Sequence, residues 1–367
     1  MLNERDPEHP RAGGAETHVH ELTRRLVTRG HEVHWRSERA PGMAANAELD
    51  GVAIERVGRG PTYYLAAFRH CRRRAEARWD VVVECLNKLP FFATAATRVP
   101  VVGLCHHLFG SAAFAQVPWP VAAGVWLLER PIPLAFRGRP LVAISQSTRD
   151  DLVARGLSED QIEVQVPGVD RPSVPAPPIA KRAPLLVYVG RLEPYKRVDL
   201  LLEAAAQLSP EIPELRVAIV GRGSAESALR QRAGALGLAD HVSFPGFVSC
   251  EERDDWLARA RVCVCPSVKE GFGLTVIEAN TLGTPNVVAD APGLRDSVRP
   301  GETGFVVATQ DARAYAARLR ELLVDDALAT RFSEAALAWS ARFDWDRAAS
   351  AFERTLVRAT TPTPESA

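Results

Sequence analysis

The chain has 367 residues, of which 46% are hydrophobic. This length exceeds that of one ordinary domain, and the apolar content suffices for two buried cores. The 45 basic and 45 acidic side chains balance each other, which argues against strong nonspecific binding to nucleic acid. No apolar run approaches the ~20 residues that a membrane-spanning helix needs.

In chain order, short β-rich runs alternate with segments of helical periodicity, a pattern typical of parallel sheets covered by helices. This pattern assigns residues 1–171 to a first domain. Its strands are predicted near residues 31–36, 52–57, 80–85, 100–105, 141–144 and 162–166, and its helices include 15–29 and 62–78.

A proline-dense segment, residues 172–184, breaks the alternation and is predicted to be the linker between two domains. The second domain is predicted over residues 185–344, followed by a helix over about 345–359 and a frayed tail. Strands of this domain are predicted near residues 185–190, 215–220, 241–244, 261–265 and 285–289, and helices near 197–207, 224–236, 251–260 and 311–324.

The cysteines include no Cys-x-x-Cys pair, and most lie in apolar runs that are predicted to be strands. This distribution favours reduced thiols in the cores over zinc ligands or disulfides. The N-terminus also lacks the pattern of a signal peptide. We therefore expect a cytoplasmic protein. The six cysteines are Cys71, Cys85, Cys105, Cys250, Cys263 and Cys265.

Residues 266–285, PSVKEGFGLTVIEANTLGTP, are the most informative stretch of the chain. A glycine-rich turn precedes an apolar run from Leu274 to Leu282, which predicts a short buried helix closed by Gly283. The first N–H groups of a helix have no partner inside the helix, so together with the helix dipole they suit an anion such as a diphosphate.

Two carboxylates flank this turn: Glu270 precedes it, and Glu278 lies about one turn inside the helix. Glycine-rich junctions with nearby acids also occur in α/β proteins that bind nothing. The whole string, however, resembles the EGFG…E signature of the retaining glycosyltransferases of family 4, which have the GT-B architecture of two Rossmann-like α/β domains facing across a cleft. In that family the first glutamate contacts hydroxyls of the donor sugar, and the second contacts the ribose of the nucleotide.

The resemblance therefore implies a catalytic role for Glu270 and donor binding by Glu278. It also implies donor binding by the turn and the start of the helix, namely Gly271, Phe272, Gly273 and Leu274. The last predicted helix, about 345–359, crosses back to the first domain in that family.

A second match is GRLEPYKR at residues 190–197, which follows a predicted strand and precedes a helix. Ligands of open α/β folds bind at this end of the sheet. Isolated charges there are most often only solvated, but Arg191 and Lys196 match the position at which family members hold the donor diphosphate. The resemblance implies that both bind the donor and act in catalysis.

Two weaker segments lie in the same domain. FPGFVS at residues 244–249 resembles the family segment whose backbone meets the nucleobase around Phe247 and Val248, although it also fits a plain strand end. GRGS at residues 221–224 lacks the third glycine of a dinucleotide fingerprint and predicts a tight turn that lines the base pocket.

The first domain carries further matches. Gly13 and Gly14 precede a helix and resemble the family's N-terminal loop, which approaches the donor diphosphate across the cleft. A histidine follows the strand at 100–105 in the family and lies near the transferred sugar. His106 aligns best with that catalytic histidine, while the adjacent His107 remains an alternative, and a lone histidine is more often structural.

One departure from the family concerns the first strand. Family members open with a central strand that runs into the glycine loop, whereas here only Met1, Leu2 and Asn3 precede the charged segment 4–10. We expect the central strand to be missing or reduced to a stub. Either the true start lies upstream, or the domain is impaired.

The acceptor is not specified by the sequence. Residues 108–140 are rich in Trp, Phe and Pro and either grip an apolar acceptor or pack on the sheet. Residues 69–74, RHCRRR, form a basic helix face that is either solvated or in contact with an anionic membrane surface.

The resemblance implies a retaining glycosyltransferase whose donor is a nucleoside-diphosphate sugar, with no other cofactor. No metal is expected, since no DxD-like carboxylate pair is placed for one. Stabilisation of the leaving diphosphate is expected to be the largest catalytic contribution. Two alternatives remain: a nucleotide-sugar epimerase on the same fold, and a noncatalytic subunit that binds the sugar nucleotide without turning it over.

Overall fold

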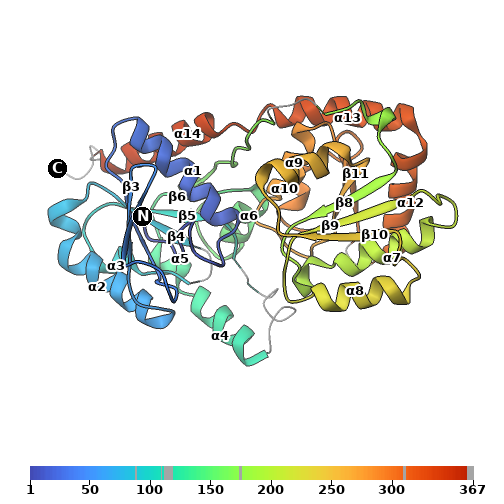
Figure 1. Ribbon diagram of the computed structural model, residues 1–367. Coiled ribbons are helices and arrows are strands. Elements are labelled where there is room, and N and C mark those ends of the chain that lie inside the picture. Colours follow the sequence, from blue (N-terminus) through green and yellow to red (C-terminus); the bar gives the residue numbers. More distant parts are fainter. Residues whose placement is uncertain (87–88, 109, 111–118, 173–175, 309–310, 362–367) are drawn as a thin grey trace. The chain divides into compact units, whose positions relative to one another are not determined.

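A computed structural model describes residues 1–86, 89–108, 110, 119–172, 176–308 and 311–361 (Figure 1). The chain divides into two compact units. The first contains Met1–Gly168 together with Asp344–Ala367, and the second contains Val169–Phe343. Among the described residues, no helix has both the length and the apolar character needed to cross a bilayer.

The strands of the first unit form two groups. One has the order β1-β3-β2 and the other the order β4-β5-β6-β7. Neighbouring strands are parallel, except that β2 pairs with β3 in antiparallel fashion. Their bounds are β1 (His34–Ser37), β2 (Asn46–Leu49), β3 (Val52–Arg56), β4 (Val82–Leu86), β5 (Val101–Cys105), β6 (Leu141–Ala143) and β7 (Ile162–Val164).

Strand β2 was not predicted from the sequence. It is joined to β3 through Asp50 and Gly51, whose φ angles are 49° and 76°. An Asp-Gly pair with both φ angles positive is the preferred two-residue turn of a hairpin. The local signal for this hairpin was therefore present in the sequence and was overlooked.

Residues 1–3 form a short stub between β1 and β4. Leu2 forms parallel bridges to Arg36 of β1 and to Glu84 of β4. Its N–H donates to the carbonyl oxygen of Val83 at 2.8 Å, and the N–H of Arg36 donates to the carbonyl oxygen of Met1 at 2.9 Å. The two groups of strands are thus joined through this short stub.

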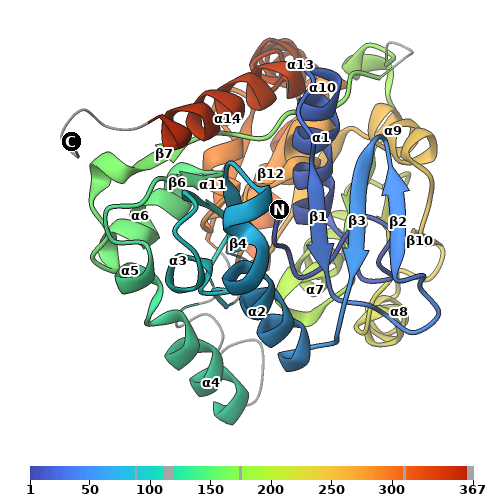
Figure 2. The same cartoon turned by 90° about the vertical axis from the view of Figure 1, so that its left-hand side faces the viewer.

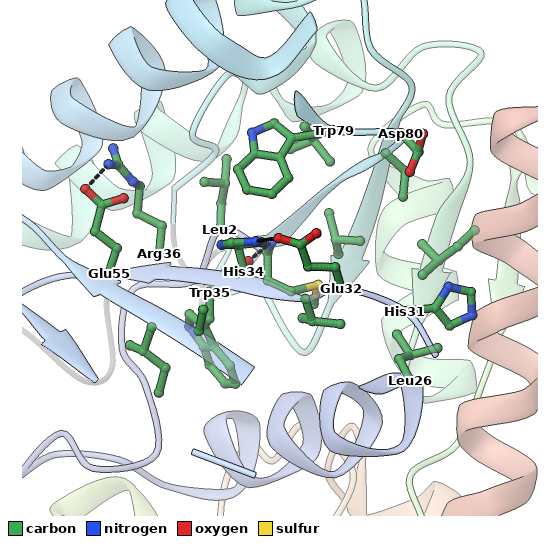
Figure 3. A pocket seen from close by; sticks show the side chains of 18 of the residues that line it. Leu2, Leu26, His31, Glu32, His34, Trp35, Arg36, Glu55, Trp79 and Asp80 are labelled. Atoms are coloured by element: carbon green, nitrogen blue, oxygen red, sulfur yellow. Dashed lines mark hydrogen bonds and ion pairs between the residues drawn. The ribbon is translucent and has the colours of Figure 1, made fainter. Parts of the chain in front are cut away.

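A cavity of about 600 Å³ adjoins the stub. Residues 33–36 line one side of it and residues 79–83 the other, and Figure 3 shows His34, Trp79 and Leu2 around this space. The amino group of Met1 donates to the carbonyl oxygen of His34 at 2.7 Å. Burial lowers the pKa of this amino group from its usual value of 8.0.

The helices of the first unit cover its strands (Figure 2). The C-terminal helix α14 packs on α1 through two ion pairs: Arg29 contacts Glu353 at 2.7 Å, and Arg25 contacts Asp346 at 2.8 Å. The bounds are α1 (Gly14–Thr28), α2 (Pro61–Arg78), α3 (Ala93–Ala96), α4 (Trp119–Glu129), α5 (Ile132–Ala135), α6 (Gln146–Ala154) and α14 (Trp345–Thr360).

The second unit contains one continuous parallel sheet of six strands in the order β10-β9-β8-β11-β12-β13. Successive strands are added on one side of β8 up to β10 and on its other side from β11 onward. Open α/β sheets bind ligands at such a switch point, here between β8 and β11. The strands are β8 (Leu185–Val189), β9 (Arg216–Val220), β10 (Val242–Gly246), β11 (Val262–Cys265), β12 (Asn286–Ala289) and β13 (Gly304–Val307).

Helices cover this sheet and bury two apolar clusters against it. Neither β13 nor α13 was predicted from the sequence. The helices are α7 (Val198–Leu208), α8 (Glu226–Ala235), α9 (Cys250–Arg259), α10 (Leu274–Thr281), α11 (Leu294–Ser297), α12 (Ala312–Val324) and α13 (Asp326–Ser340).

The segment predicted to be a linker, 172–184, is grouped with the second unit, although residues 173–175 lie outside the described part. Ile179 is buried, and the guanidinium of Arg182 donates to the carbonyl oxygens of Ala260 and Leu282. The later part of this segment is therefore built into the second unit. Arginine satisfies several carbonyl oxygens at once because its five N–H donors have a fixed geometry.

Candidate functional site

The residues singled out in the second unit gather after β8 and β11, on either side of the topological switch point. The loop after β8 carries Arg191 and Lys196, and the loop after β11 carries Glu270. The N–H of Val268 donates to the carbonyl oxygen of Tyr195 at 3.0 Å, which fastens the two loops together. Residues 74 positions apart in the sequence therefore meet at one place.

Lys196 and Glu270 form an ion pair at this point, with Nζ of the lysine in contact with Oε1 of the glutamate. Oε1 also accepts a hydrogen bond of 2.7 Å from the hydroxyl of Ser267. Burial alone would lower the pKa of Lys196, but the Glu270 carboxylate outweighs that effect and raises it. The ammonium group therefore stays charged at neutral pH.

Arg191 is more exposed than Lys196, and its guanidinium donates to the hydroxyl of Tyr195 at 3.2 Å. Its carbonyl oxygen accepts a hydrogen bond of 2.9 Å from Tyr188 at the end of β8. The backbone is thus fixed while the cationic end stays accessible. This arrangement suits a cation that has to meet an incoming anion.

The glycine-rich turn after β11 has the backbone geometry that its sequence requires. Gly273 is the N-cap of α10 and has φ = 85°, a conformation that favours glycine. A side chain at Gly293 would come within 2.4 Å of the carbonyl oxygen of Glu270. The helix ends as predicted: Gly283 has φ = 64°, and the N–H of Thr284 donates to the carbonyl oxygen of Ala279.

Two further residues of this turn lie as follows. The side chain of Phe272 is buried, and its ring centroid lies 5.5 Å from that of Phe343. Only the backbone of Phe272 is therefore available to contact a donor. Leu274 is the first residue of α10, and its side chain is half-buried.

Glu278 lies on α10 with a different partner from that of Glu270. Its Oε1 accepts a hydrogen bond of 2.8 Å from Arg253 on α9. Burial raises the pKa of Glu278, although the charge of Arg253 acts in the opposite direction. The two carboxylates are therefore held separately, one by the loop after β8 and the other by α9.

The two weaker segments have distinct environments. Phe247 is 79% exposed at the end of β10, and Val248 is half-buried. In the GRGS segment, a side chain at Gly223 would come within 2.3 Å of the carbonyl oxygen of Leu192. Glycine at position 223 thus permits two segments of the backbone to approach each other closely. This contact explains the glycine without a bound ligand.

In the first unit, His106 follows β5 and is 2% exposed. Its Nε2 lies 3.1 Å from Nδ1 of His18 on α1, and the ring of His18 stacks on that of Trp345. Burial, with a smaller contribution from His107, lowers the pKa of His106 to about 3. His106 is therefore neutral at physiological pH, and its buried Nδ1 has no hydrogen-bond partner among the described residues.

The two glycines at the start of α1 are partly engaged already. Gly13 is the N-cap of α1, and its N–H donates to Oε2 of Glu16 at 2.8 Å. A carboxylate of the chain itself thus occupies that donor, as in a capping box. An anion at this helix start would meet the N–H groups of Gly14 and the residue after it.

The sequence did not predict the partners of these residues, namely Ser267, Arg253 and His18. His18 carried a weak signal, because it lies in the helix that the Gly13 loop opens. Arg253 carried none, since an arginine in an amphipathic helix is ordinarily solvated. A buried amide pair also links β12 to α10: Asn286 Nδ2 donates to Asn280 Oδ1 at 2.7 Å.

Comparison with known proteins gives matches over most of the chain. A family model described as glycosyl transferases group 1 matches residues 171–339, and one described as glycosyltransferase family 4 matches residues 12–171. A protein of Streptomyces avermitilis named D-inositol 3-phosphate glycosyltransferase is 33% identical to this chain. The alignment covers 93% of this chain and 82% of the relative.

Solved structures are similar over nearly the full length. Sucrose-phosphate synthase from Thermosynechococcus elongatus superposes with a TM-score of 0.79 at 22% identity, covering 97% of both chains. HepE from Anabaena, in complex with UDP-glucose, superposes with a TM-score of 0.75 at 20% identity. The superposition covers 97% of this chain and 98% of the HepE chain.

Proposed function

Since this chain belongs to the family 4 glycosyltransferases of GT-B fold, as its sequence predicted, we propose that it is a retaining enzyme. Its donor in this proposal is a nucleoside-diphosphate sugar, and the sugar passes to an acceptor hydroxyl with its anomeric configuration kept. The observation that carries the proposal is the ion pair of Lys196 and Glu270 beside Arg191, at the switch point of the second unit.

The charges at this point suit a departing diphosphate. Lys196 is buried and stays protonated, so it can neutralise negative charge that grows as the glycosidic bond breaks. Arg191 supplies a second cation, and the first N–H groups of α10 supply partial positive charge. Such preorganised charges are usually the largest catalytic contribution.

Glu270 has a second task in this proposal. When a diphosphate takes up part of the lysine's charge, the Glu270 carboxylate can accept hydrogen bonds from sugar hydroxyls. Glu278, held by Arg253 on the neighbouring helix, is left to bind the ribose. His106 is neutral, so its Nδ1 can exchange a hydrogen bond with a hydroxyl but does not provide a positive charge.

The relatives named D-inositol 3-phosphate glycosyltransferase support that phosphorylated polyol as the first acceptor to test. UDP-glucose, bound in the HepE structure, supports UDP-sugars as the first donors. The experiment incubates the full chain with UDP-, GDP- and ADP-sugars, with and without D-inositol 3-phosphate, and measures nucleotide release. NMR of the product then gives the anomeric configuration.

We expect nucleotide release that depends on the acceptor and a product that keeps the donor's anomeric configuration. An inverted product would overturn the retaining mechanism. Epimerised sugar formed without any acceptor would support the epimerase, and nucleotide binding without turnover would support a noncatalytic subunit.

A further inference from the structure

Helix α4 and the segment that follows it expose an unusual set of large apolar side chains. Trp119 is 74% exposed, Leu127 60% and Leu134 77%, and Trp126 and Leu128 are exposed as well. These five lie within 16 residues of the chain, while the other exposed large hydrophobic side chains of the described residues are scattered over many elements. Clustered exposure of this kind marks an interaction surface.

The exposure does not come from a helix that lacks support. Ala122 on α4 and Ile132 on α5 are fully buried. The buried carboxylate of Glu129 accepts a hydrogen bond of 2.8 Å from the N–H of Gly110 and pairs at 3.1 Å with Arg155, which follows α6. One side of α4 is thus anchored to the first unit. Figures 1 and 2 both show α4 at the lower edge of that unit.

The charges of residues 119–140 all have one sign at the surface. Arg130, Arg137 and Arg139 are exposed, and the single acidic residue of this segment is the buried Glu129. The guanidinium carbon of Arg130 lies 4.2 Å from the ring centroid of Trp126. Residues 119–140 therefore combine aromatic, aliphatic and cationic groups, and the nearest exposed carboxylates are those of Glu159 and Asp160, which line a hollow together with Leu134, Arg137 and Arg139.

We propose that this surface, which we call the α4–α5 face, binds the headgroup region of an anionic phospholipid bilayer. Tryptophan side chains favour the membrane interface, and leucine side chains insert at the boundary of the acyl chains. Arginine side chains near the surface are attracted by anionic headgroups. Docking of a second copy of the chain on the same face is disfavoured, because it would bring the three arginines against their counterparts.

This proposal does not depend on the donor or the acceptor. It is tested by co-sedimentation of the full chain with vesicles of phosphatidylcholine alone or mixed with phosphatidylglycerol. We expect binding to the mixed vesicles that weakens as salt is added, and weak binding to phosphatidylcholine. Replacing Trp119, Leu127 and Leu134 together by Ser should reduce the vesicle-bound fraction about tenfold or more.

Substituting Gln for the three arginines of the face should weaken binding to the anionic vesicles by about fivefold for each charge removed. Two matched variants are the controls. Leu65→Ser with Val324→Ser removes exposed apolar side chains elsewhere, and Arg72→Gln with Arg73→Gln removes two exposed charges from α2. Both are expected to bind like the parent chain.

Four outcomes would overturn the proposal. Binding that survives in the Trp119, Leu127 and Leu134 variant would place the contact elsewhere, and loss in the Arg72 and Arg73 variant alone would assign it to α2. Absence of binding to either kind of vesicle would exclude a membrane contact. A change of oligomeric state in that triple-serine variant, measured by analytical ultracentrifugation, would show that a second copy covers the face.

Discussion

The two units of this protein differ at the centre of their sheets. In the second unit, β8 lies between β9 and β11, and the six strands form one continuous ladder. In the first unit, the corresponding central place is held by Leu2, which bridges Arg36 and Glu84 and adjoins a cavity of about 600 Å³. A sheet edge left unpaired lacks hydrogen bonds and side-chain packing that a full strand would supply.

The difference between the two sheets predicts different consequences for changes in each unit. The continuous sheet holds Lys196 and Glu270 in fixed positions after adjacent strands, where charge must be placed accurately. The first unit contains neither Lys196 nor Glu270. We therefore expect changes in the second unit to act on chemistry, and changes at the stub to act on stability.

The largest effect is expected for Lys196→Ala. This change removes a buried charge whose contact with a diphosphate is worth ~1.5–3 kcal/mol, so nucleoside-diphosphate affinity should fall about tenfold or more. Turnover should fall further, since negative charge grows on the leaving group in the transition state. Calorimetry with the free nucleotide and steady-state kinetics measure the two effects, and Arg191→Ala should show the same pattern. Unchanged nucleotide affinity in both variants would show that neither Lys196 nor Arg191 binds the diphosphate.

Glu270→Gln should separate sugar binding from nucleotide binding. The amide keeps the shape of the side chain but loses the charged acceptor, so affinity for the sugar nucleotide and turnover should both fall about tenfold or more. Affinity for free UDP or GDP should change little. Calorimetry with the free nucleotide and the donor compares the two, with Glu278→Gln as the matched variant. An equal loss of free-nucleotide affinity in Glu270→Gln would exchange the roles of the two glutamates.

His106→Ala tests whether the first unit also takes part in chemistry. We expect turnover to fall more than about tenfold, as is typical when a group that acts in proton transfer or hydrogen bonding is lost, while nucleotide affinity changes little. Thermal unfolding must be measured alongside, because His106 is buried against His18. His107→Ala should be milder, and the reverse ranking would assign the catalytic role to His107.

A strand added before Met1 tests the stub itself. Five Val-, Ile- or Leu-rich residues placed there should extend Leu2 along β1 and β4 and bury apolar surface in the cavity. For a unit of this size, Tm should rise by about 2–4 °C for each kcal/mol gained. An extension of equal length made of Gly and Ser is the control. Equal melting temperatures for both extensions and the parent chain would show that the cavity does not accept a strand.

The smallest expected effect concerns pH. Burial lowers the pKa of the Met1 amino group below 8.0 in the folded chain, so this group binds fewer protons when folded than when unfolded. Its contribution to stability is therefore complete above about pH 8 and is lost as the pH falls toward the folded pKa. Denaturant unfolding between pH 7 and 9 should show this slope in the parent chain. The same slope in a chain extended before Met1 would contradict the assignment to this amine.

The sequence predicted several features because their signals are local. The alternation of strands and helices, the turn at Gly273 and the end of α10 at Gly283 each depend on neighbouring residues. Arg191, Lys196 and Glu270 were singled out because their segments resemble those of a known family, and their roles stay predictions. The hairpin at Asp50 was missed although its signal was local.

The tertiary structure decided how these residues are paired. Glu270 meets Lys196, Glu278 meets Arg253, and His106 meets His18 across 74, 25 and 88 positions of the chain. These pairs follow from the order of parallel strands, which helical crossovers set and which hydrophobic periodicity does not encode. By itself, the sequence determined two α/β units and the charged residues at strand ends. Their burial, protonation and partners, and the cavity beside Leu2, arose only when distant strands were packed together.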